Sequence, residues 1–539
     1  MHSTFACPKE LQHNLFEGLS AMFGREVPLY DKSLAVNQRC NQAVCDVLSK
    51  IFVGFTRTES ELLLTGRERH GAIRIGREDE FRWVSRYFGC FDMEPHDFYD
   101  MTALGQKSQP VICTAFRSRS GPENRIFASL LRPEYFGDET ARRIASALES
   151  RQVISPQVQS VIEKKERDGG LSLEDGTFLA RQGYEKIFCW TGLASNRDLY
   201  EELCSSGYKI AADICCFPSH HLNHLTPNSL CIDLYSLAMK WKLGEKNNSD
   251  FTTESHAIIS RLADRVDSHW MMLHFPELTH RSLRSYFRAE IPQRAIEEIV
   301  SDLFCSLQHE SLDLSALPHN GYKDRTEGPD EASPILLRQD SYRALTEAIA
   351  FVDEPTPFES SHTARFGEIE QRFYATTTLG RSLYDSCLAQ RDEISGPEQR
   401  DLDPFETIPK DLETLVVEGL VYAKFEPKPD TDVQNSGGSV MSVADLMRRG
   451  LLLYRGQRYE DFLPFSAAGI FASNLDQYGT ESVSESNASY TKEYLESILG
   501  RSIVDPQATY ASVHQESLKN ALSCLGISVP SQLSMCSDD

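Results

Sequence analysis

The chain has 539 residues, of which 40% are hydrophobic, and its mean hydropathy of −0.38 predicts a water-soluble globular protein of roughly two to four domains. It carries 55 basic and 79 acidic residues, a formal net charge of −24, and no basic stripe, which argues against nucleic acid or an anionic membrane as its main partner. We expect no transmembrane helix, no signal peptide and a reducing cytoplasmic location, because no apolar window reaches about 18 residues and the 14 cysteines form no Cys-x-x-Cys pair.

The first half of the chain is predicted to begin with helices and to continue with short strands and further helices. Apolar residues recur at helical spacing within residues 10–60, at Leu11, Leu15, Leu19, Met22, Ala43, Val47 and Ile51. We then expect a strand at 71–75, a loop at 91–99, a hairpin of strands at 111–116 and 126–131, two helices within 138–167, and strands at 208–216 and 230–234.

The second half is predicted to contain a helical insertion and two further strands. Helical spacing at 258–266 and 294–307 indicates the insertion, and strand patterns follow at 335–338 and 366–371. We therefore divide the chain into N-terminal helices with the first part of a β core (1–244), the helical insertion (245–329), the second part of the β core (330–426), a flexible linker (427–442) and a C-terminal segment with a helical tail (443–539).

The most informative stretch is residues 365–372, with the sequence RFGEIEQR. On a strand, alternate side chains share a face, so Glu368, Glu370 and Arg372 lie on one face and Ile369 and Gln371 on the other. Two carboxylates side by side repel each other unless something positive or polar lies over them. That partner can be a metal ion, an arginine or water, and the strand pattern alone allows either glutamate to be a metal ligand.

Histidines elsewhere in the chain offer possible metal partners. His70 stands at the entry of the strand predicted at 71–75, and the sequence HHLNH places three histidines at 220, 221 and 224. Two histidines and one carboxylate are the ligand set of non-haem Fe(II) oxygenases, which leaves positions open for substrate and oxygen. Taken singly, each of these residues also has an ordinary explanation as a solvated or hydrogen-bonded side chain.

Several segments in the same order resemble a known family, the 2-oxoadipate dioxygenase/decarboxylases, also called 2-hydroxyglutarate synthases. The matching segments are residues 69–74, 125–134, 223–227, 334–339, 366–372, 459–464 and 466–471. The resemblance implies an α+β fold, with a curved β-sheet or half-barrel like that of the vicinal oxygen chelate proteins, surrounded by helices. It also implies an Fe(II) site.

The resemblance carries the iron ligands over to His70, His224 and Glu368, with His221 as the alternative second histidine. In 4-hydroxyphenylpyruvate dioxygenase, a chemically related enzyme, the ligand glutamate stands three residues before a Gln-Arg pair. Glu368 has that relation to Gln371-Arg372. Glu370 is then expected to support the site by orienting an imidazole or Arg372, and His221 is expected to lie close to the ligands.

The family's substrate-binding residues carry over to Arg74, for the distal carboxylate of the substrate, and to Ser466 in the pocket lining. Phe465 stands where the family has a small aliphatic residue, so its ring is expected to affect which chain length fits. The implied reaction uses O2 to convert 2-oxoadipate to 2-hydroxyglutarate and CO2 in lysine catabolism. Two alternatives are a metal-dependent lyase or isomerase of another 2-oxo acid, and a non-catalytic binding protein.

Overall fold

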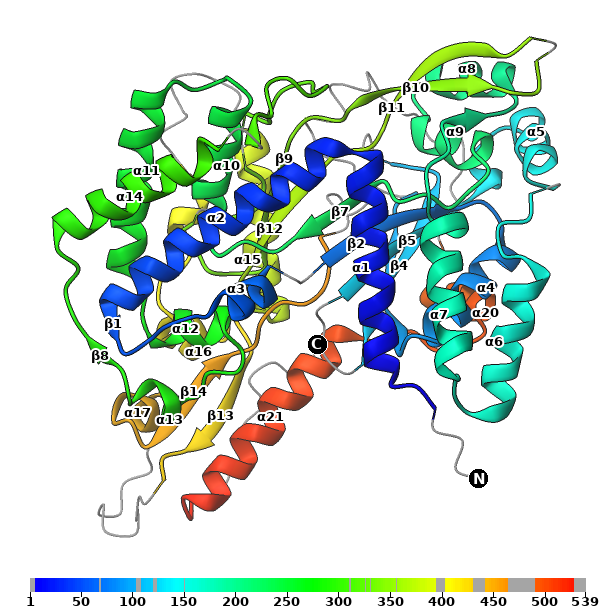
Figure 1. Ribbon diagram of the computed structural model, residues 1–539. Helices are drawn as coiled ribbons and strands as arrows, with labels where there is room; N and C mark the ends of the chain where they lie inside the picture. Colours follow the sequence, from blue (N-terminus) through cyan, green and yellow to red (C-terminus); the bar gives the residue numbers. More distant parts are fainter. Residues whose placement is uncertain are drawn as a thin grey trace.

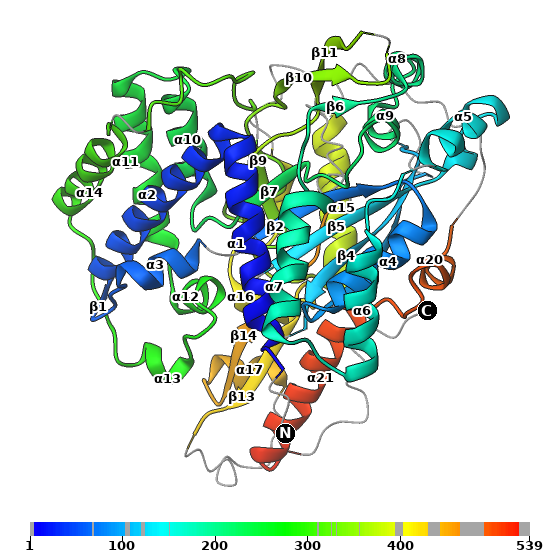
Figure 2. The same ribbon diagram turned by 45° about the vertical axis from the view of Figure 1, so that its right-hand side comes forward.

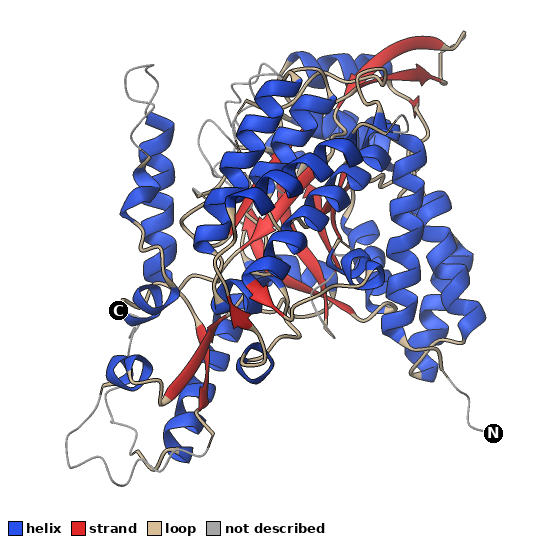
Figure 3. Cartoon of the chain, turned by 60° about the vertical axis from the view of Figure 1, so that its left-hand side comes forward, coloured by secondary structure: helices blue, strands red, loops and turns tan. Residues whose placement is uncertain are grey.

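A five-stranded mixed sheet forms the centre of the protein, with helices on both of its faces (Figures 1 and 3). The computed structural model describes residues 5–66, 69–102, 108–119, 124–149, 151–309, 312–324, 326–329, 331–354, 356–393, 403–429, 442–463 and 490–527. The strand order of this sheet is β3-β4-β5-β2-β7. Its strands are β2 (Arg69–Ile75), β3 (Met93–Asp100), β4 (Val111–Ser118), β5 (Asn124–Leu131) and β7 (His224–Pro227).

The hairpin predicted at 111–131 is confirmed, because β4 and β5 pair antiparallel with Val111 opposite Leu131. The strand predicted at 71–75 is confirmed as β2, which runs parallel to β5 and antiparallel to β7. Alternate residues of these strands lie on opposite faces. One face packs against the N-terminal helices through Ile73 and Phe116, and the other carries Ala72 and packs against a second hydrophobic cluster.

A second, two-stranded sheet continues beyond β7 and contains the acidic stretch. Its strands are β9 (Leu337–Ser341) and β12 (Glu368–Arg372), which pair antiparallel with Glu368 opposite Ser341. A bridge between Asn228 and Glu370 joins β12 to the end of β7. The strand predicted at 366–371 is therefore confirmed, and every residue of β12 is buried.

Three smaller sheets lie around this centre. They contain β6 (Leu193–Ala194), β10 (Thr346–Phe351) and β11 (Phe358–Thr363) in one sheet, β13 (Ala423–Pro427) and β14 (Leu452–Gly456) in another, and β1 (Phe52–Val53) and β8 (Phe287–Arg288) in the third. Within the described residues, none of these sheets closes into a barrel. The mixed helix and sheet architecture agrees with the expected α+β class, whereas the relation to the vicinal oxygen chelate fold stays a prediction.

Helices form most of the surface in Figure 3. The N-terminal half contains α1 (Pro8–Glu26), α2 (Pro28–Ile51), α3 (Glu59–Thr65), α4 (Glu78–Gly89), α5 (Asp138–Glu149), α6 (Pro156–Asp168), α7 (Leu173–Gln182), α8 (Arg197–Ser205), α9 (Lys209–Cys216) and α10 (Ile232–Lys242). The remainder contains α11 (Asn248–Arg265), α12 (Ser268–His274), α13 (His280–Leu283), α14 (Gln293–Leu307), α15 (Thr378–Glu393), α16 (Leu412–Val417), α17 (Val443–Arg448), α20 (Lys492–Leu499) and α21 (Pro506–Cys524). These bounds confirm the helices predicted within 10–60, 138–167, 258–266 and 294–307.

The helices predicted as an insertion pack closely on the N-terminal helices. Figures 1 and 2 show α11 and α14 beside α2 and α10, in green and blue on the left. Ile258 and Leu303 belong to the same hydrophobic cluster as Val44 of α2. The proposed division of the chain into segments stays a prediction, and residues 430–441 of the predicted linker lie outside the described part.

Three sequence-based assignments are wrong. The predicted loop at 91–99 contains β3, whose register shifts between His96 and Tyr99 and interrupts the alternating pattern that identifies a strand. The predicted strand at 208–216 is helix α9, and the one at 230–234 leads into helix α10. Both are short apolar runs, and periodicity cannot separate a buried strand from a buried helix in such a run. Across the described ranges, no helix combines the length and apolar character needed to cross a membrane.

Candidate metal centre

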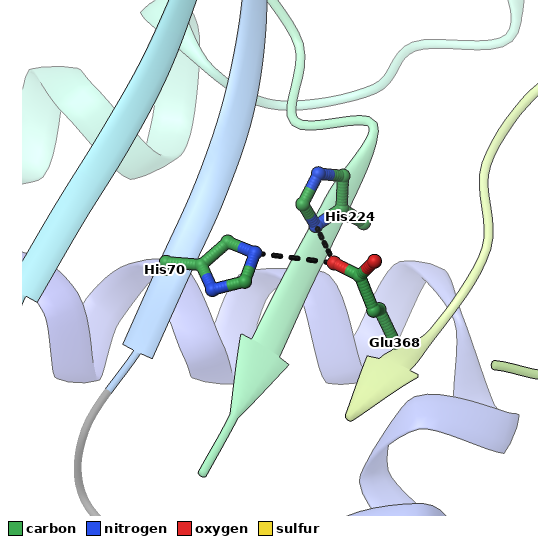
Figure 4. A group of neighbouring side chains, drawn as sticks. All are labelled: His70, His224 and Glu368. Carbon is green, nitrogen blue, oxygen red and sulfur yellow. Dashed lines mark hydrogen bonds and ion pairs between the residues drawn. The ribbon is translucent and has the colours of Figure 1, made fainter. Parts of the chain in front are cut away.

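Three buried side chains from three strands converge beside the central sheet (Figure 4). They are His70 of β2, His224 of β7 and Glu368 of β12, and their side chains are at most 1% exposed. Glu368 Oε2 lies 3.1 Å from His70 Nε2 and 3.5 Å from His224 Nδ1. The structure thus brings together the three residues that are predicted as metal ligands from the sequence.

Strand register explains this convergence. Because His70 pairs with Thr226 and Ala72 pairs with His224, the two histidines lie on the same face of neighbouring strands. Their positions differ by two residues in register. The bridge between Asn228 and Glu370 sets the register of β12 beside β7. Glu368 lies two residues before Glu370, so both side chains are on the same face of the strand. Residues far apart in the chain therefore meet through sheet pairing.

The donor set fits a metal ion. The three potential ligand atoms lie within 4.8 Å of one another, and the two N–O distances of 3.1 and 3.5 Å are close to the roughly 3 Å that separates neighbouring ligands at metal–ligand distances of about 2.1 Å. Glu368 Oε1 is buried and makes no hydrogen bond within the described residues, so it can donate a lone pair to a metal ion. In the part of the chain that the structure describes, this is the only such group of three. These residues can therefore bind a metal ion.

Other polar groups surround the three residues. The Thr226 hydroxyl lies 3.0 Å from His224 Nδ1 and donates a hydrogen bond to Glu368 Oε2 at 2.9 Å. Glu370 Oε2 lies 2.9 Å from His70 Nδ1, on the side of the ring opposite to the Glu368 contact. Arg372 donates to both oxygens of Glu370, at 2.8 and 3.0 Å. The geometry thus gives the two glutamates separate positions around one imidazole.

Charge neighbours set the protonation of these groups. Burial by itself would lower the pKa of His70, but the carboxylates of Glu370 and Glu368 outweigh it and raise the pKa. Burial would raise the pKa of Glu370, but Arg372 and His70 outweigh it and hold the pKa below its usual range. Glu370 is therefore a charged carboxylate that can fix the orientation of the His70 ring.

A chain segment just before residue 464 is held against the site. Arg372 donates to the carbonyl oxygens of Tyr459 and Asp461 at 3.1 and 2.8 Å. Phe462 packs its ring edge-on against His70, with ring centroids 5.0 Å apart. Arg117 of β4 and Arg125 of β5 form ion pairs with Asp461 and Glu460, respectively. Three arginines from three strands therefore hold residues 459–461 in place, next to Phe462.

Two other predicted site residues lie in a separate polar cluster. Arg74 contacts Asp213 of α9, with Nη1 2.6 Å from Oδ2. His221 contacts the same carboxylate, with Nε2 3.1 Å from Oδ1, and does not belong to the group of three potential ligands. Ser466 and Phe465 lie outside the described residues.

Sequence reasoning did not find Asp213 or its further partner, His362 of β11. Asp213 is the only charged residue in the apolar run from 210 to 216, which is a signal that could have marked it. His362 is the only buried residue of β11, and nothing in its local sequence sets it apart.

Comparisons with known proteins show which family the chain matches. The family described as 2-oxoadipate dioxygenase/decarboxylase matches residues 15–250 and 309–474. A curated 2-oxoadipate dioxygenase/decarboxylase of Pseudomonas putida is 29% identical over 97% of this chain and 98% of its own length, and one of Escherichia coli is 30% identical over 94% and 97%. A solved hydroxyglutarate synthase of Pseudomonas putida in complex with 2-oxoadipate is similar with a TM-score of 0.67 and 28% identity, over 97% of this chain and 99% of that one.

Proposed function

The chain belongs to the 2-oxoadipate dioxygenase/decarboxylase family, and we propose that it converts 2-oxoadipate and O2 to 2-hydroxyglutarate and CO2, with Fe(II) as its metal. The observation that carries this proposal is the buried group of His70, His224 and Glu368, in a chain that matches enzymes of this name along nearly its whole length. The reaction balances, because one carbon leaves as CO2 and the two oxygen atoms of O2 enter the products.

We propose that His70, His224 and Glu368 are the metal ligands. With two imidazoles and one carboxylate as ligands, a bound ion would keep further positions for substrate and oxygen. When bound, Fe(II) supplies the redox chemistry with O2 and the open positions at which a 2-oxo acid can chelate. Glu370 acts on the His70 ring through Nδ1, and Arg372 keeps Glu370 charged, so that His70 presents Nε2 to the ion.

We propose that Arg74 binds the carboxylate of the substrate that lies farthest from its ketone. Arg74 stands two same-face steps from His70 along β2, so its side chain leaves the same face of the sheet as the ligand. Its side chain is 11% exposed, and a guanidinium can hold a carboxylate through two parallel hydrogen bonds. Ser466 and Phe465 remain part of the proposal as residues that line the pocket.

The test is to load the protein with Fe(II) under anaerobic conditions, add 2-oxoadipate and oxygenated buffer, and measure O2 uptake, CO2 and 2-hydroxyglutarate. We expect the three quantities to agree, and we expect Glu368→Gln to abolish all of them. Product formation without O2 uptake would instead support a metal-dependent lyase or isomerase. Substrate binding without any product would support a binding protein.

A further inference from the structure

A second buried polar cluster surrounds the carboxylate of Asp213, a residue of α9 that is 2% exposed. Oδ2 accepts hydrogen bonds from Arg74 at 2.6 Å and from the Asn223 amide at 3.2 Å. Oδ1 lies 3.1 Å from Nε2 of His221 and 3.1 Å from Nε2 of His362. The four side chains reach this carboxylate from three different parts of the chain.

This carboxylate is charged in spite of its burial. Burial by itself would raise the pKa of Asp213, but His221 and Arg74 outweigh it and hold the pKa well below its usual range. A buried charge is retained only where hydrogen bonds and opposite charges surround it. The neighbours of Asp213 therefore fix its position as well as its charge.

The two histidines are themselves held in place. The Tyr200 hydroxyl lies 2.9 Å from His362 Nδ1, so a neutral His362 can accept from Tyr200 and donate its Nε2 proton to Asp213. Trp190 packs edge-on against His221, with ring centroids 4.5 Å apart, and lies parallel to His362 at 5.9 Å. These contacts leave little freedom for the imidazoles, and hence for Asp213.

Arg74 has a different position in the cluster from the other three donors. His221, His362 and Asn223 are all at most 3% exposed, whereas the Arg74 side chain is 11% exposed. Within the described residues, Arg74 contacts Asp213 through Nη1 alone, while a guanidinium has five N–H donors. Asp213 therefore anchors one nitrogen of Arg74, and the remaining donors are available to a ligand.

We propose that Asp213, held by His221 and His362, is a positioning residue that aims Arg74 at the far carboxylate of the substrate and so makes the site selective for dicarboxylic 2-oxo acids. This inference rests on the proposed function. An arginine held at one nitrogen reaches a carboxylate with less loss of side-chain freedom than an unrestrained one. A 2-oxo acid with a methyl group at its far end does not use this interaction.

The experiment compares 2-oxoadipate with 2-oxohexanoate, which has the same six-carbon chain without the far carboxylate. Asp213→Asn keeps the shape of the side chain and removes its charge. We expect this variant to raise the KM for 2-oxoadipate about tenfold or more and to change the KM for 2-oxohexanoate less than about twofold, with the kcat for 2-oxoadipate nearly unchanged. Anaerobic calorimetric titration of the Fe(II)-loaded protein should show the same loss of 2-oxoadipate affinity without turnover.

His362→Gln provides a second variant in case Asp213→Asn fails to fold. It retains a donor near Asp213 but cannot also accept from Tyr200 as the imidazole does, so a smaller shift in the same direction is expected. Asp340→Asn is the matched control, because Asp340 is also buried, at 1% exposed, and contacts Ser236 instead of Arg74. We expect this control to retain the preference for 2-oxoadipate.

Two outcomes would overturn the inference. If folded Asp213→Asn or His362→Gln protein retains the wild-type preference, or loses both substrates equally, Asp213 does not position Arg74 for a carboxylate. If the wild-type protein neither binds nor consumes 2-oxoadipate, the proposed function fails as well, and this result is distinguishable because it concerns the unmodified chain.

Discussion

Glu370 Oε2 lies 2.9 Å from Nδ1 of His70, so the second glutamate of β12 contacts a different ring nitrogen from the one that Glu368 contacts. The opposite nitrogen of the same ring, Nε2, lies 3.1 Å from Glu368. One imidazole therefore lies between two carboxylates that are two residues apart in the chain. Such a contact orients a metal-binding histidine and makes it a stronger donor.

The two glutamates should respond differently to the same substitution. Glu368→Gln should abolish iron binding, because an amide is a weak ligand in place of a carboxylate. Glu370→Gln should retain the site and weaken iron binding about 10- to 100-fold, which is the usual cost of losing a group that orients a ligand. Anaerobic metal titration with measured iron content would check both variants.

Circular dichroism and thermal unfolding of the two variants would show whether each one folds. If Glu370→Gln alone abolished iron binding and Glu368→Gln retained it, the roles of the two glutamates would be reversed.

Arg74→Met should reduce kcat/KM for 2-oxoadipate about 100-fold, because loss of a charge-assisted, two-point contact costs a few kcal/mol. The side chain keeps a similar length and loses its charge. Steady-state oxygen consumption across 2-oxo acids of different length would measure the effect. Arg77→Met, on an arginine that pairs with Asp79 near the surface, is the matched control, and full activity of Arg74→Met would contradict the assigned role.

Phe462→Ala should both destabilise the protein and weaken iron binding. Phe462 is 1% exposed and packs against His70 at 5.0 Å and Phe127 at 5.4 Å. Removal of a buried phenylalanine ring costs about 3–5 kcal/mol of unfolding free energy. Chemical denaturation and anaerobic metal titration would measure the two effects.

The control for this change is Phe116→Ala, on a fully buried phenylalanine that packs against Phe88 on the other face of the sheet. It should reduce the unfolding free energy by a similar amount and leave iron affinity unchanged. Equal iron affinities for Phe462→Ala and wild type would show that the ring does not hold His70.

The stability of the protein should depend on pH through Glu331. Burial, and next the carboxylate of Asp233, raise the pKa of Glu331 from 4.5 to about 7. The folded state therefore binds a proton that the unfolded state has released. This contribution to stability is fully present below about pH 4.5 and is lost as the pH rises through about 7.

Chemical denaturation of wild type and Glu331→Gln between pH 5 and pH 8 would test this expectation. The unfolding free energy of the wild type should decline more steeply with rising pH than that of the variant. Glu359→Gln, on an exposed glutamate of β11, should follow the wild type. Parallel wild-type and Glu331→Gln curves would contradict the assignment.

Much of the fold could be predicted from periodicity alone. The long amphipathic helices α1, α2 and α14 and the hairpin of β4 and β5 have clear patterns, and all of them are present. The sequence predicts a strand where helix α9 lies, because its residues are buried all around, which removes the period that distinguishes a helix. Tertiary packing decides whether such a segment forms a helix or a strand, and a local sequence pattern does not contain that information.

The candidate site was predictable to a similar degree. Alternation along β12 placed Glu368 and Glu370 on one face, and both contact His70. The choice between them needed the family resemblance and the spacing from Gln371-Arg372, because the strand pattern treats them alike. The partnership of Asp213 with His362 could not be predicted, because it joins α9 to a strand with no other buried residue through contacts that no local pattern encodes.

The separation of the three proposed ligands along the chain has a consequence during synthesis. His70 and Glu368 are 298 residues apart, and the segment that supports His70 follows at 459–463. A growing chain contains both histidines long before Glu368 leaves the ribosome. Bringing Glu368 to His70 closes a loop of 298 residues, and the entropy that this closure costs is offset when the strands of the sheet pair. If His70, His224 and Glu368 hold iron as proposed, iron bound by all three marks a chain whose central strands have already assembled.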